Sequence, residues 1–257
     1  MKIKHVIQVN LTERDSEILP GAKEFIKKYA ANSLGERGLH MFLDKNDLAE
    51  ALAMLSQYGL KYERFYDLEV ESDELETYPA LFFNFPIEFE LFVGEDGEEW
   101  ADATVINDYQ MVEDCKSHTI VVSPLVKQIV ERTTKGVQWQ SVETTNGEEW
   151  FIMQVTEILP NPIIVVSPIE VKPYEKFPEV YSVICDDRFV VTIDNIAKLA
   201  EVGMALSLNM KISSEVLRWD SCILASGKVI HALESAGIKQ IRQDIHPLLT
   251  PEHPLSH

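Results

Sequence analysis

Cysteine is scarce in this chain of 257 residues, which contains only Cys115, Cys185 and Cys222. The three are widely spaced and form no CxxC pair, which argues against a disulfide framework and against a structural zinc site. No run of 18 apolar residues occurs, so the sequence predicts no transmembrane helix. The opening MKIKHVIQVNLTERD lacks the apolar stretch of a signal peptide, and we expect a cytoplasmic protein that does not contact a membrane.

The short motifs that mark common catalytic sites are also missing. The chain has no P-loop, no GxGxxG, no HExxH and no GxSxG pattern. We therefore predict no cofactor, no metal and no catalytic residue, and we favour a non-catalytic protein over an enzyme.

Two groups of residues suggest chemistry, and each has a simpler structural explanation. Cys115 and His118 form a CxxH pair, but no second pair stands at the spacing of metal ligands. Cys222 and His231 flank Ser226, which invites a nucleophile and a base. Ser226, however, occupies a predicted helix cap, and no motif supplies the acid that would orient the histidine.

A third group contains Asp186, Asp187 and Asp194, within ICDDRFVVTID. The first two are most simply explained by a tight turn, and Asp194 by the N-cap of a following helix. A carboxylate cluster for magnesium remains the alternative, although no glycine-rich phosphate loop accompanies it.

Lysine and arginine are absent from the 51 residues between Arg64 and Lys116, which contain 16 of the 42 acidic residues of the chain. The other 26 acids nearly balance the 23 bases, so the net charge of −19 arises in this segment. Such a charge would repel phosphates, and we expect no direct contact with nucleic acid. The simplest explanation of the excess negative charge is that it keeps the protein soluble. A more specific explanation is that it binds a basic partner protein or a cation.

The candidate partner-binding residues surround a predicted hairpin turn, GEDG, inside this acidic segment. Trp100 is included because aromatic side chains are enriched in binding hot spots, although it could simply fill a sheet face. The candidate set is Glu95, Asp96, Glu98, Glu99, Trp100 and Asp102.

The apolar patterns predict an α+β fold with antiparallel hairpins, a mixed sheet and helices on one face. Residues 44–58 show helical spacing, with Asp44 as the N-cap and Gly59 at the C-terminal end. Asn146-Gly147, between two β-rich arms, is a strong hairpin signal. The change in charge predicts an acidic N-terminal region at residues 1–114 and a second region at 115–257.

Residues 120–131 and 223–234 align without a gap, each as a strand, a serine and an amphipathic helix. A further strand is expected after each helix, at 136–142 and 238–245, so we predict a duplicated β-Ser-α-β unit. The tetrapeptide VVSP also occurs twice, but Pro173 prevents a helix after the second copy, and we interpret this repetition as accidental.

The segments IVVSPLVKQIVE, GVQWQSVE and EEWFIMQV, followed by YSVICDDRFVVTID and CILASGKVIHALESAGIKQIRQD, carry a resemblance to a known family. Over residues 117–246 the chain resembles a widespread family of uncharacterised bacterial proteins, some of which resemble immunity proteins of polymorphic toxin systems. The resemblance implies a binding protein that neutralises a toxin, here through an acidic surface, and it brings no catalytic residue. The alternative is an enzyme that acts on a small cationic or metal-bound substrate through carboxylates of residues 67–114.

Overall fold

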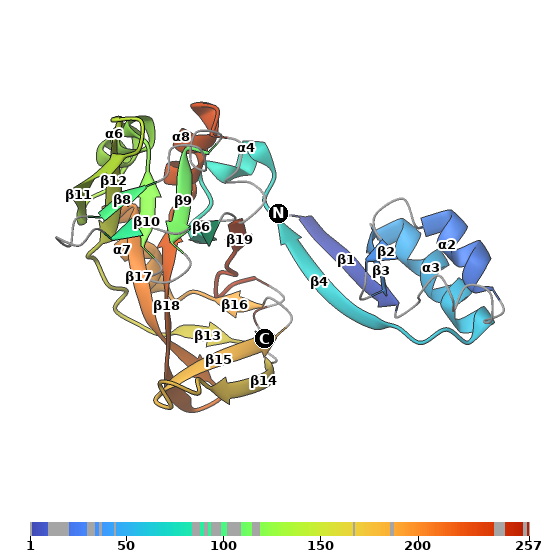
Figure 1. Ribbon diagram of the computed structural model, residues 1–257. Coiled ribbons are helices and arrows are strands. Elements are labelled where there is room, and N and C mark those ends of the chain that lie inside the picture. Colours follow the sequence, from blue (N-terminus) through green and yellow to red (C-terminus); the bar gives the residue numbers. More distant parts are fainter. Residues whose placement is uncertain are drawn as a thin grey trace. The chain divides into compact units, whose positions relative to one another are not determined.

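The computed structural model describes residues 2–9, 21–29, 34–35, 38–43, 45–83, 88–89, 92–93, 99–101, 109–114, 119–166, 168–185, 188–238, 245–253 and 256. The chain divides into two compact units, Met1–Glu69 and Val70–His257. Figure 1 labels most elements of each unit.

The first unit is an antiparallel sheet with two helices. Its elements are β1 (Lys2–Val9), α2 (Ala22–Tyr29), β2 (Leu34–Gly35), β3 (Gly38–Leu43), α3 (Lys45–Tyr58) and β4 (Glu63–Glu69). The strand order is β2-β3-β1-β4, and β1 is antiparallel to both β3 and β4. This order is a split β-α-β arrangement, in which each helix connects two parallel strands across an intervening one.

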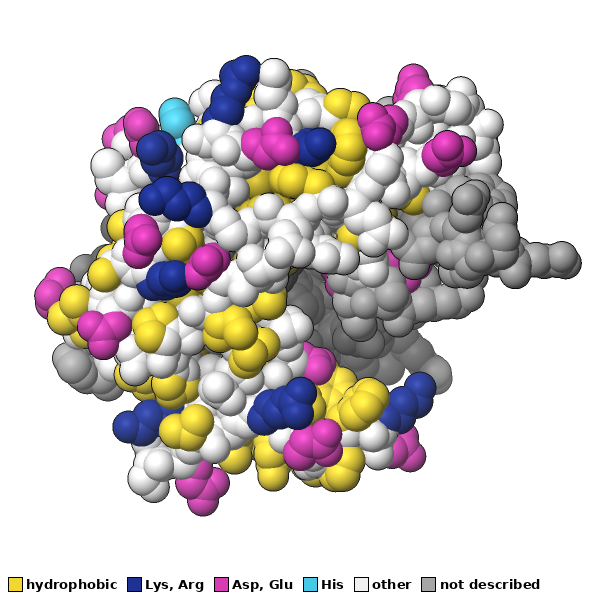
Figure 2. Space-filling model, turned by 90° about the vertical axis from the view of Figure 1, so that its left-hand side faces the viewer, with side chains coloured by type: hydrophobic (Ala, Val, Ile, Leu, Met, Phe, Trp, Pro, Cys, Tyr) yellow, Lys and Arg dark blue, Asp and Glu magenta, His cyan; other side chains and the backbone are white. Residues whose placement is uncertain are grey.

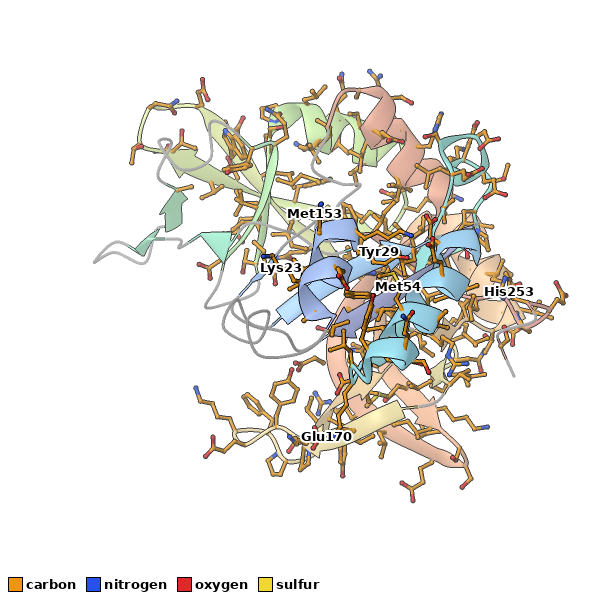
Figure 3. The ribbon with its side chains drawn as sticks, turned by 90° about the vertical axis from the view of Figure 1, so that its right-hand side faces the viewer. Lys23, Tyr29, Met54, Met153, Glu170 and His253 are labelled. Carbon is orange, nitrogen blue, oxygen red and sulfur yellow. The ribbon has the colours of Figure 1, made fainter. Side chains whose placement is uncertain are left out.

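Both helices of the first unit bury apolar side chains against one face of its sheet. The shared core contains Ile7, Val9, Phe25, Leu48, Ala51 and Leu55. In α3 the buried residues recur at steps of three and four, as one face of a helix requires. Figure 3 shows Tyr29 on α2 and Met54 on α3, and both pack against this core.

The end of α3 agrees with the sequence-based prediction. Gly59 has φ +65°, and the N–H of Leu60 donates to the carbonyl of Leu55 at 2.9 Å, which closes the last turn of the helix. Asp44, the predicted N-cap, lies outside the described residues.

The second unit contains two sheets and the remaining helices. One sheet has the order β6-β9-β10-β12-β11-β8-β7. Its strands are β6 (Glu88–Phe89), β7 (Phe92–Val93), β8 (Glu99–Ala101), β9 (Met111–Asp114), β10 (Ile120–Val122), β11 (Val137–Thr144) and β12 (Glu149–Val155). We call it the seven-stranded sheet.

The other sheet, the eight-stranded sheet, has the order β14-β15-β18-β17-β13-β16, with β5 and β19 attached beside β18. Its strands are β5 (Leu81–Phe83), β13 (Ile163–Val165), β14 (Pro168–Pro173), β15 (Val180–Cys185), β16 (Phe189–Val190), β17 (Met204–Ile212), β18 (Glu215–Ala225) and β19 (Ile245–Pro247). The helices of the unit are α4 (Ser72–Leu75), α6 (Pro124–Thr133), α7 (Ile193–Val202) and α8 (Gly227–Ser235).

A single apolar core joins the two sheets of the second unit. Val126 of α6 and Leu233 of α8 are fully buried in it, together with Val122 of the seven-stranded sheet and Met204 of the eight-stranded sheet. The two helices lie beside one another, as Figure 1 shows. Full burial of one such side chain stabilises the fold by about 1.5–3 kcal/mol, so these helices tie the sheets together.

The eight-stranded sheet is packed on both of its faces. Met204 and Ala225 pair across β17 and β18 and belong to the core with α6 and α8. Their neighbours Ala205 and Leu224 pair on the opposite face and pack with Leu199 of α7. The α+β class predicted from sequence is thus confirmed, but α7 lies on the opposite face from α8, whereas helices on one face were expected.

The two predicted strand-Ser-helix segments share a topology. β12 is antiparallel to both β10 and β11, so β10 and β11 run parallel with α6 between them in sequence. In the same way β5 is antiparallel to both β18 and β19, which α8 connects. The strand in the middle differs in origin: β12 follows β11 in the chain, whereas β5 comes far before β18. The duplication itself stays a prediction.

The division between the two units differs from the predicted one. Strands on either side of residue 115 are direct neighbours, because β9 and β10 pair from Met111↔Val122 to Glu113↔Ile120. The seven-stranded sheet also contains strands from before and after this position. The compact units instead meet at Glu69 and Val70.

Among the described residues, no helix is both long enough and apolar enough to cross a membrane.

Candidate partner-binding surface

The first predicted hairpin is present at one end of the seven-stranded sheet. β7 and β8 are antiparallel, with Phe92 opposite Trp100 and Val93 opposite Glu99. Residues 94–98 therefore connect two paired strands, as the GEDG motif predicted. Glu99 and Trp100 begin β8, whereas Glu95, Asp96, Glu98 and Asp102 lie outside the described residues.

A second group of acidic residues lies next to β8. β8 runs parallel to β11, with Trp100 beside Glu143, and Glu143 in turn pairs with Glu149 of β12. Glu143, Glu148 and Glu149 are all exposed. We call Glu143, Glu148 and Glu149, which lie on β11, β12 and the turn between them, the acidic sheet end.

The β11–β12 turn is held by hydrogen bonds of its own. The N–H of Gly147 donates to the carbonyl of Thr144 at 2.9 Å, and Gly147 has φ +79°, which favours glycine. The Thr144 hydroxyl donates to the carbonyl of Glu148 at 2.7 Å, and the N–H of Glu148 donates to Asn146 Oδ1 at 3.1 Å. The adjacent acidic side chains are therefore carried on an ordered turn.

The facing pair Glu143 and Glu149 opposes folding. Like charges directly opposite each other on antiparallel strands destabilise the fold. The interactions of such cross-strand pairs are worth about 0.2–1 kcal/mol. One contact offsets part of this effect, since the Ser141 hydroxyl donates to Glu149 Oε1 at 2.7 Å. Neither Lys nor Arg occurs between Lys135 and Lys172, so the hairpin contains no basic side chain.

The surface as a whole is not uniformly acidic. In the view of Figure 2, lysine and arginine side chains lie among aspartate and glutamate side chains. A net charge of −19 therefore does not make every part of the surface equivalent. The position of an acidic residue matters for any partner that recognises charge.

In the part of the chain that the structure describes, the carboxylates of the alternative, enzymatic hypothesis do not gather at one place. β6 and β9 carry Glu88 beside Glu113, at the opposite edge of the seven-stranded sheet from β8 and its Glu99. Asp73 and Glu76 belong to the region of α4. Among the described residues, no group of three or more His, Cys, Asp or Glu is placed to hold a metal ion.

The candidate nucleophile and base do not contact each other. Cys222 lies in β18, and burial raises the pKa of its thiol, which disfavours the reactive thiolate. Ser226 precedes α8, and its N–H donates to the carbonyl of Gly203 at 2.8 Å. His231 Nε2 lies 3.4 Å from the hydroxyl of Ser235, which is one turn further along α8. The hydrogen-bonding partner of the histidine is therefore Ser235 and neither Cys222 nor Ser226.

The predicted N-cap at Asp194 is wrong. α7 begins two residues earlier, with Thr192 as its N-cap, whose hydroxyl accepts from the N–H of Asn195 at 3.2 Å. Asp194 instead accepts from Asn161 Nδ2 at 3.1 Å. Cys115, His118, Asp186 and Asp187 lie outside the described residues.

Sequence reasoning missed Glu143, Glu148 and Glu149 as neighbours of the predicted surface. The available signal was the tetrapeptide GEEW, which occurs at both hairpins and places two acids after each turn. Only the pairing of β8 with β11 brings the two hairpins together.

Comparison of the chain with protein-family models, with curated proteins and with solved structures finds no match.

Proposed function

We propose that this chain is a non-catalytic protein that binds a basic partner protein through the acidic sheet end and the acidic connection before β8. The observation that carries the proposal is the parallel pairing of β8 with β11, which puts two acidic hairpins side by side. The resemblance to bacterial immunity proteins supports a more specific form, in which the partner is a toxin that the binding neutralises.

Charge at this place would act mainly on the rate of association. Several carboxylates of one sign on ordered strands attract a basic protein before contact, over a Debye length of about 8–10 Å at 0.1–0.15 M salt. Such steering raises association rates by 10 to 10³ and weakens as salt increases. Binding of the partner is therefore expected to be fast at low ionic strength and strongly salt-dependent.

The enzymatic alternative has less support. Those of its carboxylates that the structure describes lie on β4, in the region of α4 and at the two edges of the seven-stranded sheet. A site for a small substrate needs groups that converge on one place.

The test uses the product of the gene that neighbours this one in its source genome. Co-expression should relieve growth inhibition by that product, and the purified pair should associate rapidly at low salt. A neighbouring product without toxicity or affinity would contradict the immunity role. A product that binds but is not toxic would retain the binding role alone.

The contribution of the acidic sheet end is tested by reversing Glu143, Glu148 and Glu149 to Lys. We expect the association rate at low salt to fall at least about tenfold, with a much smaller change at 0.5 M salt. A parallel variant reverses Glu95, Asp96, Glu98 and Glu99, and we expect the same loss. Because Glu143, Glu148 and Glu149 are exposed, the free energy of unfolding should change by less than about 0.5 kcal/mol for each substitution in the triple variant.

A matched control reverses three other exposed acids, Glu175, Glu179 and Glu215, near the starts of β15 and β18. It changes the net charge by the same amount as the triple variant of the hairpin. An equal loss of association in the control would show that only net charge matters, and would contradict a localised binding surface.

A further inference from the structure

We draw no further inference here: the strongest candidate, the exposed apolar side chains Tyr174, Phe177 and Val216 at the end of the eight-stranded sheet where β15 and β18 begin, has charged neighbours of both signs, and nothing in the structure shows what covers it.

Discussion

Asn195 is a fully buried polar residue whose side chain makes two hydrogen bonds with the backbone of one other residue. Its Oδ1 accepts from the N–H of Asn161 and its Nδ2 donates to the carbonyl of Asn161, both at 3.0 Å. Asn161 stands between Pro160 and Pro162, in a segment with no helix or strand of its own to satisfy these groups. The Asn195 amide therefore holds the segment around Asn161 against the first turn of α7.

Replacing Asn195 by Ala should lower the free energy of unfolding by about 2 kcal/mol or more, because two backbone groups lose their partner. Urea denaturation of the variant and the wild type measures the difference. Asp194→Ala is the matched control, since it removes the other contact to Asn161, an exposed one, and should cost less than about 1 kcal/mol. Equal losses in both variants would contradict the role assigned to Asn195.

Tyr78 links the segment before β5 to the C-terminal part of the second unit. Its hydroxyl donates to the carbonyl of Leu248 at 2.9 Å. Burial raises the pKa of this phenol above its ordinary value of 10, and the nearby charge of Glu74 acts in the same direction. A group whose pKa is higher in the folded state contributes stability that is fully present below the unfolded pKa and is lost as the pH rises above it.

The wild type should therefore lose stability steeply above pH 10, partly through Tyr78. Tyr78→Phe should cost about 1 kcal/mol at pH 7, where it removes one hydrogen bond, and should make the decline between pH 10 and 11 shallower. Urea denaturation at the three pH values provides the comparison. If the free energy of unfolding fell equally with pH in the wild type and the variant, the phenol of Tyr78 would not be the cause of the pH dependence.

At the scale of elements, the starts of α6 and α8 were predictable from sequence, but the atoms that cap them were not. Ser123 and Ser226 both precede helices and both have extended backbone angles, as their shared pattern predicted. The Ser123 hydroxyl accepts from the N–H of Val126 at 3.3 Å, whereas the Ser226 side chain makes no capping hydrogen bond. Local sequence sets the backbone at a cap, but the hydroxyl rotamer depends on neighbours that are distant in sequence.

This difference predicts unequal effects of the same substitution. Ser123→Ala should lower the free energy of unfolding by about 1 kcal/mol, because it removes a helix cap. Ser226→Ala should cost clearly less, since no capping bond is lost. Thermal and urea denaturation of both variants would decide, and a larger loss at Ser226 would contradict the assignment.

The start of α8 shows a second effect that the sequence alone does not reveal. The N–H of Gly227 donates to the carbonyl of Tyr78 at 2.8 Å, and a Cβ at this position would overlap the carbonyl oxygen of Leu75. Glycine is needed here because the backbone at the end of α4 and just after it approaches the start of α8 so closely. From sequence, the contact could not be predicted, since the two segments are about 150 residues apart.

At the scale of the whole molecule, the α+β class and the hairpins were predictable, because turn motifs and apolar periodicity act locally. The boundary of the units was not, since it depends on which strands pair. The predicted position, residue 114, follows the change in charge, yet β9 and β10 pair across it and β5 pairs with β18. Of the candidate site, the β7–β8 and β11–β12 hairpins were predictable from their turns. The pairing of β8 with β11 was not, because it joins strands of separate hairpins.

Fragments of the chain should reflect this arrangement. Residues 70–257 should unfold cooperatively as a separate protein, because the two units divide at Glu69 and Val70 and the core that joins the two sheets begins at Val70. Residues 115–257 should fail to do so, because that fragment lacks Leu75, Leu81, Phe83 and Met111 of that core. Circular dichroism during urea denaturation measures both, and a cooperative transition in the shorter fragment would contradict the division at Val70.

The insertion of β5 between β18 and β19 also governs the order in which the protein can be assembled on a ribosome. Phe82 and its partner Leu224 in β18 are separated by about 140 residues, which take roughly 7 to 28 seconds to synthesise at 5–20 residues per second. During that interval the strand Leu81–Phe83, which is apolar and buried in the finished protein, has neither of its neighbours. A chaperone that shields short apolar segments should therefore be recruited to this stretch in nascent chains, and released once synthesis has passed β19.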